Sequence, residues 1–370
     1  MQTSDVVIIG GGLIGLCCAR WLCRAGFRVV LLERDTVGKQ ASWAAAGMLA
    51  PHFESPAHPP FYSLCLKGLE MYQEFSRELF SETGIRVGYR NLGALALFFE
   101  EGEIEDSRAR LQWFNNRGAD LAWLSQKEVL EREPELSRHI LKGQWIPKDH
   151  QINNRQLLLA LTRALIQDGV EIYEKQPVTD FLIQENKVKG VQTHLGAFYA
   201  GWVVNAAGCW AGRIDLNVEG ARFSLQPLKG QMVALDMRGI ANFKHVIHGN
   251  SVYLVPRESG HLLLGATEEE AGFDNHTTVA GIQDLLTRAM TLSPKIDQMP
   301  ILSTWSGLRP CSQDRLPILG PTPLHGYLIA AGHFRNGILL APITAKLIAE
   351  FVLSGHVPEL MQPFLLQRFL

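Results

Sequence analysis

Short, wholly apolar runs alternate with segments of helical periodicity at both ends of the chain. Val6–Ile9 is such a run, and it is followed by helical spacing over Leu13–Ala25 and a second run over Arg28–Leu32. Wholly apolar runs predict strands that are covered on both faces, as in a parallel sheet. Similar strands are expected at Trp202–Asn205 and Tyr327–Ala330, and the second of these precedes a long final helix.

The central part of the chain mixes strand-like and helical segments. Further strands are expected at 94–99, 170–173, 230–235, 252–256 and 261–265. Helices are expected at 62–83, 104–117, 126–132, 153–167 and 279–292. Residues 178–192 predict a hairpin that turns at Glu185-Asn186. The small, apolar residues 41–52 predict a loop.

The two patterns interleave, and a chain of 370 residues favours two domains over one simple core. We expect an α/β nucleotide-binding domain that is assembled from residues 1–86, 141–222 and 301–370. A second, α+β domain with a mostly antiparallel sheet is expected from residues 87–140 and 223–300.

Composition and charge narrow the class of protein. Hydrophobic residues make up 46% of the chain, charged residues 19%, and the formal net charge is −2. These values are typical of a soluble globular protein and predict no nucleic-acid or membrane partner. The apolar segment Gly337–Leu353 contains Pro342, Lys346 and Glu350 and is shorter than a spanning helix usually needs. We expect it to be a buried helix.

The cysteines indicate packing residues rather than a metal site or a redox pair. They are Cys17, Cys18, Cys23, Cys65, Cys209 and Cys311. None forms a C-x-x-C pair or a metal-ligand spacing with histidine, so no metal is expected. Free cysteines suit a reducing compartment, and the N-terminus has no basic leader before its apolar run. The sequence therefore predicts a cytoplasmic protein.

A glycine motif follows the first expected strand. Gly10, Gly12 and Gly15 form a G-x-G-x-x-G that opens the first helix, and Glu33 ends the second strand 18 residues later. In this context the motif predicts a dinucleotide site, with Leu13 and Ile14 at the helix start. The helix N-terminus offers N–H groups to a pyrophosphate, and the carboxylate accepts hydrogen bonds from a ribose. The motif alone leaves NAD and FAD open.

Five further segments identify the superfamily. They are Ser42–Pro51 (SWAAAGMLAP), Val252–Arg257 (VYLVPR), Gly265–Thr267, Trp305–Pro310 (WSGLRP) and Gly332–Pro342 (GHFRNGILLAP). With these segments the chain resembles the glycine oxidases of the D-amino-acid oxidase superfamily along essentially its whole length. The resemblance implies FAD as the dinucleotide. It also implies a Rossmann-like FAD-binding domain of the glutathione-reductase type, interleaved with a mostly antiparallel substrate domain.

The resemblance assigns the cofactor contacts to particular positions. The loop at residues 45–48 is implied to lie against the flavin ring, residues 41–42 near phosphate or ribose, and Val178 against the adenine. Residues 333–339 are implied to place helix N–H donors near the flavin, where they stabilise negative charge. The full expected set is Gly10, Gly12, Leu13, Ile14, Gly15, Glu33, Arg34, Ala41, Ser42, Ala45, Ala46, Gly47, Met48, Val178, His333, Phe334, Arg335, Asn336, Gly337, Ile338 and Leu339.

The resemblance also implies the substrate contacts and the reaction. Arg309 is expected to bind the carboxylate of an amino acid, assisted by the hydroxyl of Tyr253, and Arg335 to border the substrate. Ser251 and Glu268 match positions in the pocket wall, and their roles stay open. The implied reaction is oxidative deamination of glycine, sarcosine and small D-amino acids by hydride transfer to the flavin. Oxygen is then reduced to hydrogen peroxide, and no residue is assigned as a catalytic acid or base.

Several further expectations follow from the resemblance. Sarcosine oxidases of the superfamily tether flavin through a cysteine near the position of residues 306–308, which read Ser-Gly-Leu here, so non-covalent FAD is expected. Homo-oligomers and transfer of the imine product to thiazole synthesis for thiamine are also expected. The alternatives are a quinone-linked D-amino-acid dehydrogenase, a tRNA-modifying flavin oxidase and a non-catalytic FAD-binding subunit.

Overall fold

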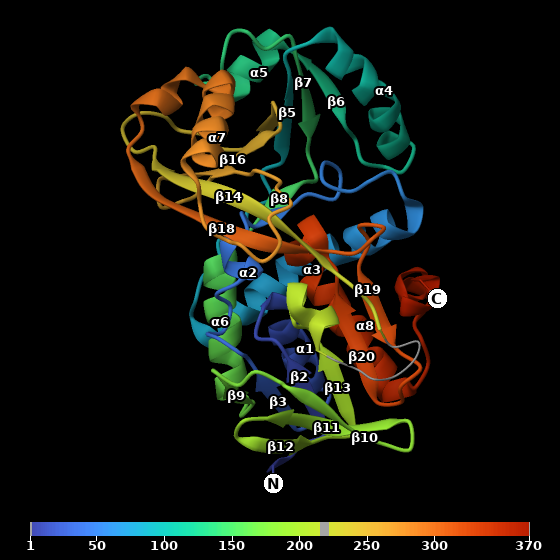
Figure 1. Cartoon of the computed structure of the whole chain (residues 1–370). Helices are drawn as coiled ribbons and strands as arrows, with labels where there is room; N and C mark the ends of the chain where they lie inside the picture. The colour runs from blue at the N-terminus through green and yellow to red at the C-terminus, as the bar shows by residue number, and fades with distance from the viewer. Residues whose placement is uncertain (1, 215–221, 370) are drawn as a thin grey trace.

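The computed structural model describes residues 2–214 and 222–369, and two large sheets divide them into a lower and an upper half (Figure 1). The lower half is built on a six-stranded sheet with the order β19-β20-β13-β2-β3-β9. Its strands are β2 (Val6–Ile9), β3 (Val29–Leu32), β9 (Glu171–Tyr173), β13 (Trp202–Asn205), β19 (Ile318–Pro321) and β20 (Tyr327–Ala331). All are parallel except β19.

Both faces of this sheet are covered, which explains its wholly apolar strands. One face packs on α1 (Leu13–Arg24), α3 (Pro59–Thr83), α6 (Asn154–Gln167) and α8 (Gly337–Ser354). A four-stranded sheet covers the other face. Its strands are β1 (Gln2–Thr3), β10 (Asp180–Gln184), β11 (Lys187–Thr193) and β12 (Gly196–Tyr199). Glu185 and Asn186, both at positive φ, turn the β10–β11 hairpin as predicted.

Helix α8 is apolar except on the exposed side that carries Lys346 and Glu350, because neighbours cover the rest of it. The segment Phe334–Ser354 is long and apolar enough to cross a membrane by length and composition, but 72% of its most apolar window is buried. Helices α1 and α3 pack on it, and its C-terminus ends at Gly355 in the left-handed conformation. It is the core helix that the sequence predicted.

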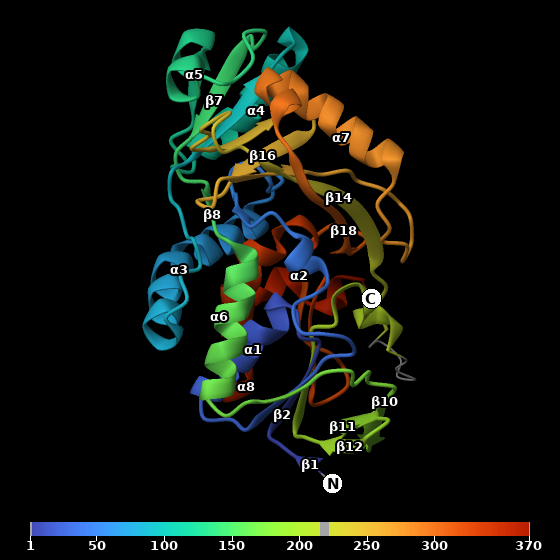
Figure 2. The same ribbon diagram turned by 90° about the vertical axis from the view of Figure 1, so that its left-hand side faces the viewer.

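The upper half is an eight-stranded sheet with the order β18-β14-β17-β16-β15-β5-β7-β6. Its strands are β5 (Ala94–Phe98), β6 (Ala122–Ser125), β7 (Lys142–Ile146), β14 (Gln226–Asp236), β15 (Val246–Gly249), β16 (Val252–Pro256), β17 (His261–Gly265) and β18 (Ile301–Cys311). Neighbours are antiparallel except β15 and β5. Three helices lie outside it, α4 (Glu101–Asn115), α5 (Gln126–Arg132) and α7 (Val279–Leu292), as Figures 1 and 2 show.

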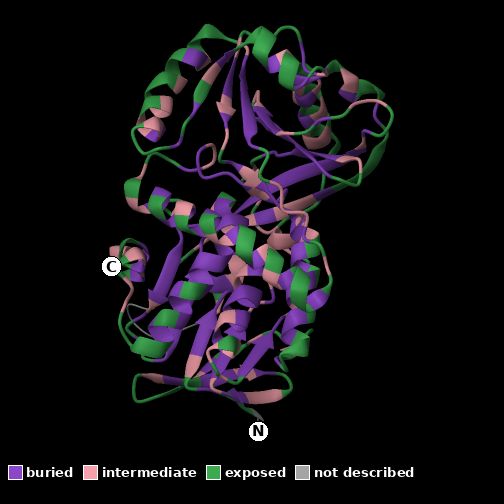
Figure 3. Ribbon diagram, turned by 180° about the vertical axis from the view of Figure 1, so that it is seen from behind, coloured by how far each residue is buried: buried purple, intermediate pink, exposed green. Residues whose placement is uncertain are grey.

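The two halves meet along β14 and β18, the two longest strands (Figure 2). Figure 3 shows that the buried residues run through the strands of both sheets, whereas the helices expose their outer faces. The fold is the predicted combination of a Rossmann-like domain and a mostly antiparallel domain. The domain boundaries stay a proposal, and we place residues 142–146 and 301–311 with the upper sheet, because β7 and β18 pair there.

The loop predicted at residues 41–52 is more ordered than expected. It contains a single helical turn, α2 (Ala41–Ala44), and a short strand, β4 (Met48–Leu49), which pairs with β8 (His150–Gln151). Its small residues allow this close packing between the two halves, where Trp305 Nε1 donates to the carbonyl of Ala44 at 2.9 Å. The remaining described elements are 3-10 turns at Gly208–Arg213, Pro294–Gln298, Phe334–Asn336, Glu359–Phe364 and Leu366–Phe369.

Candidate active site

One long cavity runs from the carboxyl edge of the lower sheet to the face of β14 and β18, and most of the predicted site residues line it. The predicted residues on its wall are Gly10, Gly12, Leu13, Ile14, Glu33, Arg34, Ala41, Ser42, Ala45, Ala46, Gly47, Met48, Val178, Tyr253, Arg309, His333, Phe334, Arg335, Asn336, Gly337 and Ile338. Gly15 and Leu339 lie behind the wall. The sequence did not single out Glu54, Trp210, Gly230 and Met232, which also line the cavity.

The glycine turn requires its glycines for two different reasons. Gly10 has φ +105°, and a Cβ there would lie 2.5 Å from the carbonyl oxygen of Ala206, the residue that follows the neighbouring strand β13. A Cβ on Gly15 would collide with the carbonyl oxygen of Gly10, so Gly15 lets α1 start directly against the turn. Gly15 therefore shapes the turn from behind the cavity wall, and its expected contact with the cofactor stays a prediction.

Polar groups around the turn hold its backbone in place. The buried carboxylate of Glu33 accepts hydrogen bonds from the N–H groups of Gly11 (2.7 Å) and Asp35 (2.8 Å). The hydroxyl of Ser42 accepts from the N–H of Leu13 at 2.9 Å, in the first turn of α1. These contacts pin the start of the helix, whose N–H groups and positive dipole end suit a phosphate group.

The small-residue loop at residues 45–48 is braced by a buried arginine. Gly47 has φ +72°, and a Cβ there would collide with the carbonyl oxygen of Ile152. The guanidinium of Arg257 donates to the carbonyls of Ala46 (2.6 Å) and Ile152 (2.9 Å), and to Asn154 Oδ1 (3.2 Å). Burial lowers the pKa of Arg257 to about 9. Its hydrogen-bond partners among the described residues are all neutral oxygens, and it lies immediately behind the cavity wall.

The segment after β20 closes the other side of the cavity. His333 is buried, its Nε2 lies 3.0 Å from Thr344 Oγ1, and burial lowers its pKa to about 3, so the ring is neutral. The hydroxyl of Tyr72 donates to the carbonyl of Ile338 and fixes the first turn of α8. The side chain of Leu339 packs in the core of the lower half, behind the cavity wall, and its expected contact with the cofactor stays a prediction.

Arg309 and Tyr253 stand together at the upper end of the cavity. Arg309 comes from β18, and its Nη1 donates to the carbonyl of Thr267 at 3.1 Å. The hydroxyl of Tyr253 contacts Met232 Sδ at 3.3 Å. Burial raises the pKa of Tyr253, and the Arg309 charge only partly offsets this, so the phenol keeps its proton. No carboxylate among the described residues is paired with Arg309, and its charge is free for an anion.

Arg335 is engaged by two carboxylates beside this end of the cavity. Its Nε donates to Glu54 Oε2 at 2.7 Å and its Nη1 to Glu268 Oε2 at 3.1 Å, while Arg315 lies 3.8 Å from Glu268. The charge of Glu54 raises the pKa of Arg335 against the effect of burial, with smaller contributions from Tyr253 and then Glu268. Glu268 is therefore not itself on the cavity wall, but it binds Arg335, which is. Ser251 lies apart, in the exposed turn between β15 and β16.

The residues present fit FAD. A glycine cradle with an acidic residue at the end of the next strand suits the ribose and pyrophosphate of a dinucleotide. The cavity then continues past the loop at residues 45–48 to the pair Arg309 and Tyr253, which leaves room for a ring system between them. Residues 5–351 match the family model described as FAD dependent oxidoreductase. The chain belongs to this family of flavoproteins, and its cofactor is FAD.

Individual relatives show which members of this family the chain resembles. The chain is 36% identical to a glycine oxidase of Geobacillus kaustophilus, over 98% of this chain and 97% of that protein. Its fold superposes on the crystal structure of glycine oxidase from that organism with a TM-score of 0.94 and 33% identity, covering 100% and 99% of the two chains. It is 38% identical to the bifunctional protein ThiO/ThiG of Trichormus variabilis over its whole length. It spans about half of that relative, 55%.

Proposed function

We propose that the chain is an FAD-dependent amino-acid oxidase that deaminates glycine, with sarcosine and small D-amino acids as further substrates. Overall, glycine, oxygen and water would give glyoxylate, ammonia and hydrogen peroxide. Relatives named glycine oxidase, matched over nearly their whole length, support this assignment. The observation that carries it is the guanidinium of Arg309 on the cavity wall, bonded to neutral carbonyls and beside the protonated hydroxyl of Tyr253.

The bound FAD would supply the two-electron oxidation and pass the electrons to oxygen. The chain's own part is to bind and orient the substrate. The planar fork of Arg309 suits bidentate binding of a carboxylate, and the Tyr253 hydroxyl can donate to the same group. Met232 and Gly230 give this end of the cavity a neutral wall. Arg335 and Glu54 also line the cavity, and their ion pair borders this end of it.

The substrate assignment is tested by replacing Arg309. Arg309→Ala would leave a carboxylate unpaired in the cavity, which typically costs roughly 2–5 kcal/mol, or about thirtyfold to several-thousandfold in kcat/KM for glycine. Arg309→Lys should recover only part of this, because a point charge replaces a fork. Residual oxidation of ethylamine, an amine without a carboxylate, should fall much less. An equal loss for both amines would show that Arg309 maintains the fold or the cofactor instead.

The wider context of the activity is also proposed. A relative that joins ThiO to ThiG in one chain supports transfer of the imine product to thiazole synthesis, and this role supports a cytoplasmic location. We further propose homo-oligomers. Within the described residues β18 is an edge strand of the upper sheet, and Ile301 and Leu302 at its start expose apolar side chains, as does Val279 at the start of α7. Light scattering at several concentrations would measure the oligomeric state.

A further inference from the structure

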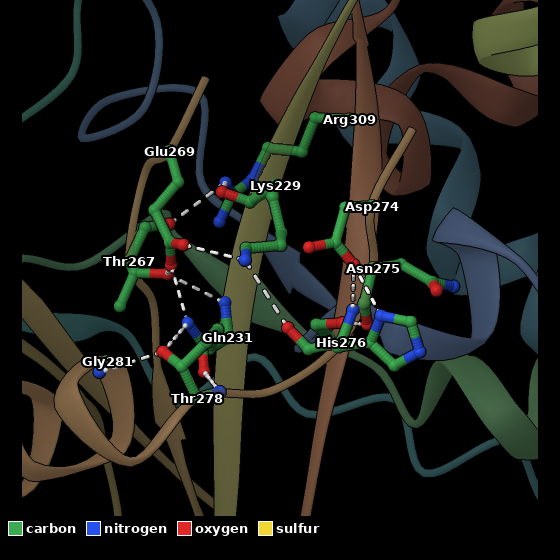
Figure 4. A network of polar contacts seen from close by, with 11 residues as sticks. Lys229, Gln231, Thr267, Glu269, Asp274, Asn275, His276, Thr278, Gly281 and Arg309 are labelled. Atoms are coloured by element: carbon green, nitrogen blue, oxygen red, sulfur yellow. Dashed lines mark hydrogen bonds and ion pairs between the residues drawn. The ribbon is translucent and has the colours of Figure 1, made fainter. Parts of the chain in front are cut away.

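A buried lysine next to the substrate end of the cavity is not used by the proposed chemistry. Lys229 lies on β14, and its side chain is 3% exposed. Its Nζ forms an ion pair with Glu269 Oε2 at 2.8 Å and donates to the carbonyl of His276 at 3.3 Å (Figure 4). Lysine is rarely buried unless it is paired, so the pair with Glu269 accounts for its charge.

Glu269 is the centre of a wider network. Its Oε1 accepts hydrogen bonds from Thr267 Oγ1 at 2.5 Å and from Gln231 Nε2 at 2.8 Å (Figure 4). The backbones of Lys229 and Glu269 also pair in both directions at 2.9 Å. Burial would raise the pKa of Glu269, but the hydrogen bonds from Lys229, Thr267 and Gln231 outweigh it, and the pKa lies below its ordinary value. The carboxylate is therefore ionised and fully engaged.

Two residues of this network, Lys229 and Thr267, also supply the carbonyl oxygens that accept hydrogen bonds from Arg309. Its Nη1 donates to the carbonyl of Thr267 at 3.1 Å and to that of Lys229 at 3.5 Å. The side chain of Lys229 binds Glu269 directly, and that of Thr267 binds it through the hydroxyl. The residue between Lys229 and Gln231 is Gly230, and the guanidinium lies across it. Figure 4 shows Arg309 at the side of this network.

We propose that Glu269, together with Lys229 and Thr267, is a positioning residue that sets the orientation of the Arg309 guanidinium for the substrate carboxylate. The network fixes the two carbonyls that engage Nη1, which leaves Nη2 and Nε to meet the ligand. Bidentate binding depends on the angle of the fork, so preset acceptors lower the cost of binding. This inference rests on the proposed function, in which Arg309 binds a carboxylate.

The test compares Glu269→Gln with a matched neighbour. Glu270 is exposed and makes no hydrogen bond or ion pair with a described residue, so Glu270→Gln removes the same charge without touching the network. The probe is acetate, which has the carboxylate of glycine and no amine. Its dissociation constant is measured on the FAD-loaded enzyme from the change in flavin absorbance. We expect Glu269→Gln to raise the dissociation constant of acetate about tenfold, because a binding group that is slightly misplaced loses much of its interaction. Glu270→Gln should leave this constant unchanged.

A second pair of variants guards against misfolding. Thr267→Val removes the hydroxyl that donates to Glu269 and accepts from the N–H of Gln231 at 2.9 Å, but it leaves the Lys229–Glu269 pair intact. Thr267→Ser keeps the hydroxyl. Acetate binding should weaken severalfold in Thr267→Val and be restored in Thr267→Ser. With glycine, both damaging variants should raise KM more than they lower kcat.

The outcomes separate the inference from the function on which it rests. Loss of stability or FAD content in Glu269→Gln and Thr267→Val, with acetate binding unchanged, would overturn the positioning role. If Arg309→Ala itself left acetate binding unchanged, the carboxylate assignment of Arg309 would fail instead. Weakened binding in Arg309→Ala, Glu269→Gln and Thr267→Val together is the result expected.

Discussion

The Cα of Gly230 lies directly beneath the guanidinium of Arg309, so that a Cβ built there would lie 2.6 Å from both Cζ and Nη1. Gly230 sits in the middle of β14 with ordinary strand geometry, so its backbone does not need glycine. A glycine inside a strand often marks the close approach of another group. Here that group is the cation at the end of the cavity.

Gly230→Ala should therefore reduce carboxylate binding without unfolding the protein. The displaced atoms are the far end of a flexible side chain, and the guanidinium can move while the strand remains in place. We expect about a tenfold weaker affinity for acetate and little change in melting temperature. Gly102→Ala, at a position in α4 with open space around it, is the control. Unchanged affinity in Gly230→Ala would show that the position of Arg309 is less constrained than the geometry indicates.

The brace formed by Arg257 should matter for both stability and cofactor affinity. Arg257→Met leaves the carbonyls of Ala46 and Ile152 without their buried donor, at about 1–3 kcal/mol for each unsatisfied group. Urea unfolding should show a loss of at least about 2 kcal/mol, and the dissociation constant of FAD should rise. Arg257→Lys should be intermediate. Arg238→Met, which removes an exposed partner of Asp236, should change stability little. Equal free energies of unfolding for Arg257→Met and Arg238→Met would show that the hydrogen bonds of Arg257 do not stabilise the fold.

His248 should make stability depend on pH. It is 1% exposed and its ring stacks on Phe53. Neither ring nitrogen has a hydrogen-bond partner among the described residues. Burial, followed by the charges of Arg335 and Arg110, lowers its pKa to about 3. The unfolded chain binds a proton below about pH 6.5 and the folded chain does not, so stability falls as the pH drops from 6.5 toward 3. At pH 5 this loss is about 2 kcal/mol.

His248→Phe removes this contribution, so the variant should lose less stability than the wild type between pH 7 and pH 5. Unfolding free energies in urea, with saturating FAD at both pH values, give the comparison. His333 is shifted in the same direction but is present in both proteins, so its contribution cancels. Parallel pH profiles for the two proteins would mean that the unfolded and folded states titrate His248 alike.

FAD should be released by acid, because the chain has no suitable cysteine for a covalent link. Of the six cysteines, Cys209 lines the cavity, and burial raises its pKa to about 12, so the nucleophilic thiolate is scarce. Cys311 lies off the cavity wall with its Sγ against the carbonyl of Ser312. Acid precipitation should leave the yellow colour in the supernatant. A yellow pellet that turns colourless in Cys209→Ala would identify a tether.

The sequence predicted those parts of the fold whose signal is local. The helix expected at 279–292 has these bounds, and strands such as β2 are apolar because both faces are covered. Strand β18 was not predicted as a whole, because its first four residues are exposed at a sheet edge and carry no alternating pattern. The helical turn at Ala41–Ala44 was missed because small residues alone do not distinguish a turn of helix from a loop.

The candidate site was predictable where a motif marks it and not where distant residues meet. The glycine turn and the segment after β20 carry such motifs. The pair of Glu54 and Arg335 joins residues 281 positions apart, and nothing in either local sequence indicates the other. Gly230 was open to prediction, since a lone glycine inside an expected strand is a recognised sign of close approach. The roles of Arg309 and Tyr253 stay predictions until they are measured.

The most direct test of the account is to add glycine to the purified, FAD-loaded protein without oxygen and record the flavin absorbance. If glycine is the electron donor, the absorbance near 450 nm should bleach, and it should return when air is admitted, with one hydrogen peroxide formed for each flavin. Arg309→Ala should bleach far more slowly at the same glycine concentration. A flavin that stays yellow with glycine, sarcosine and D-alanine alike would contradict the assignment.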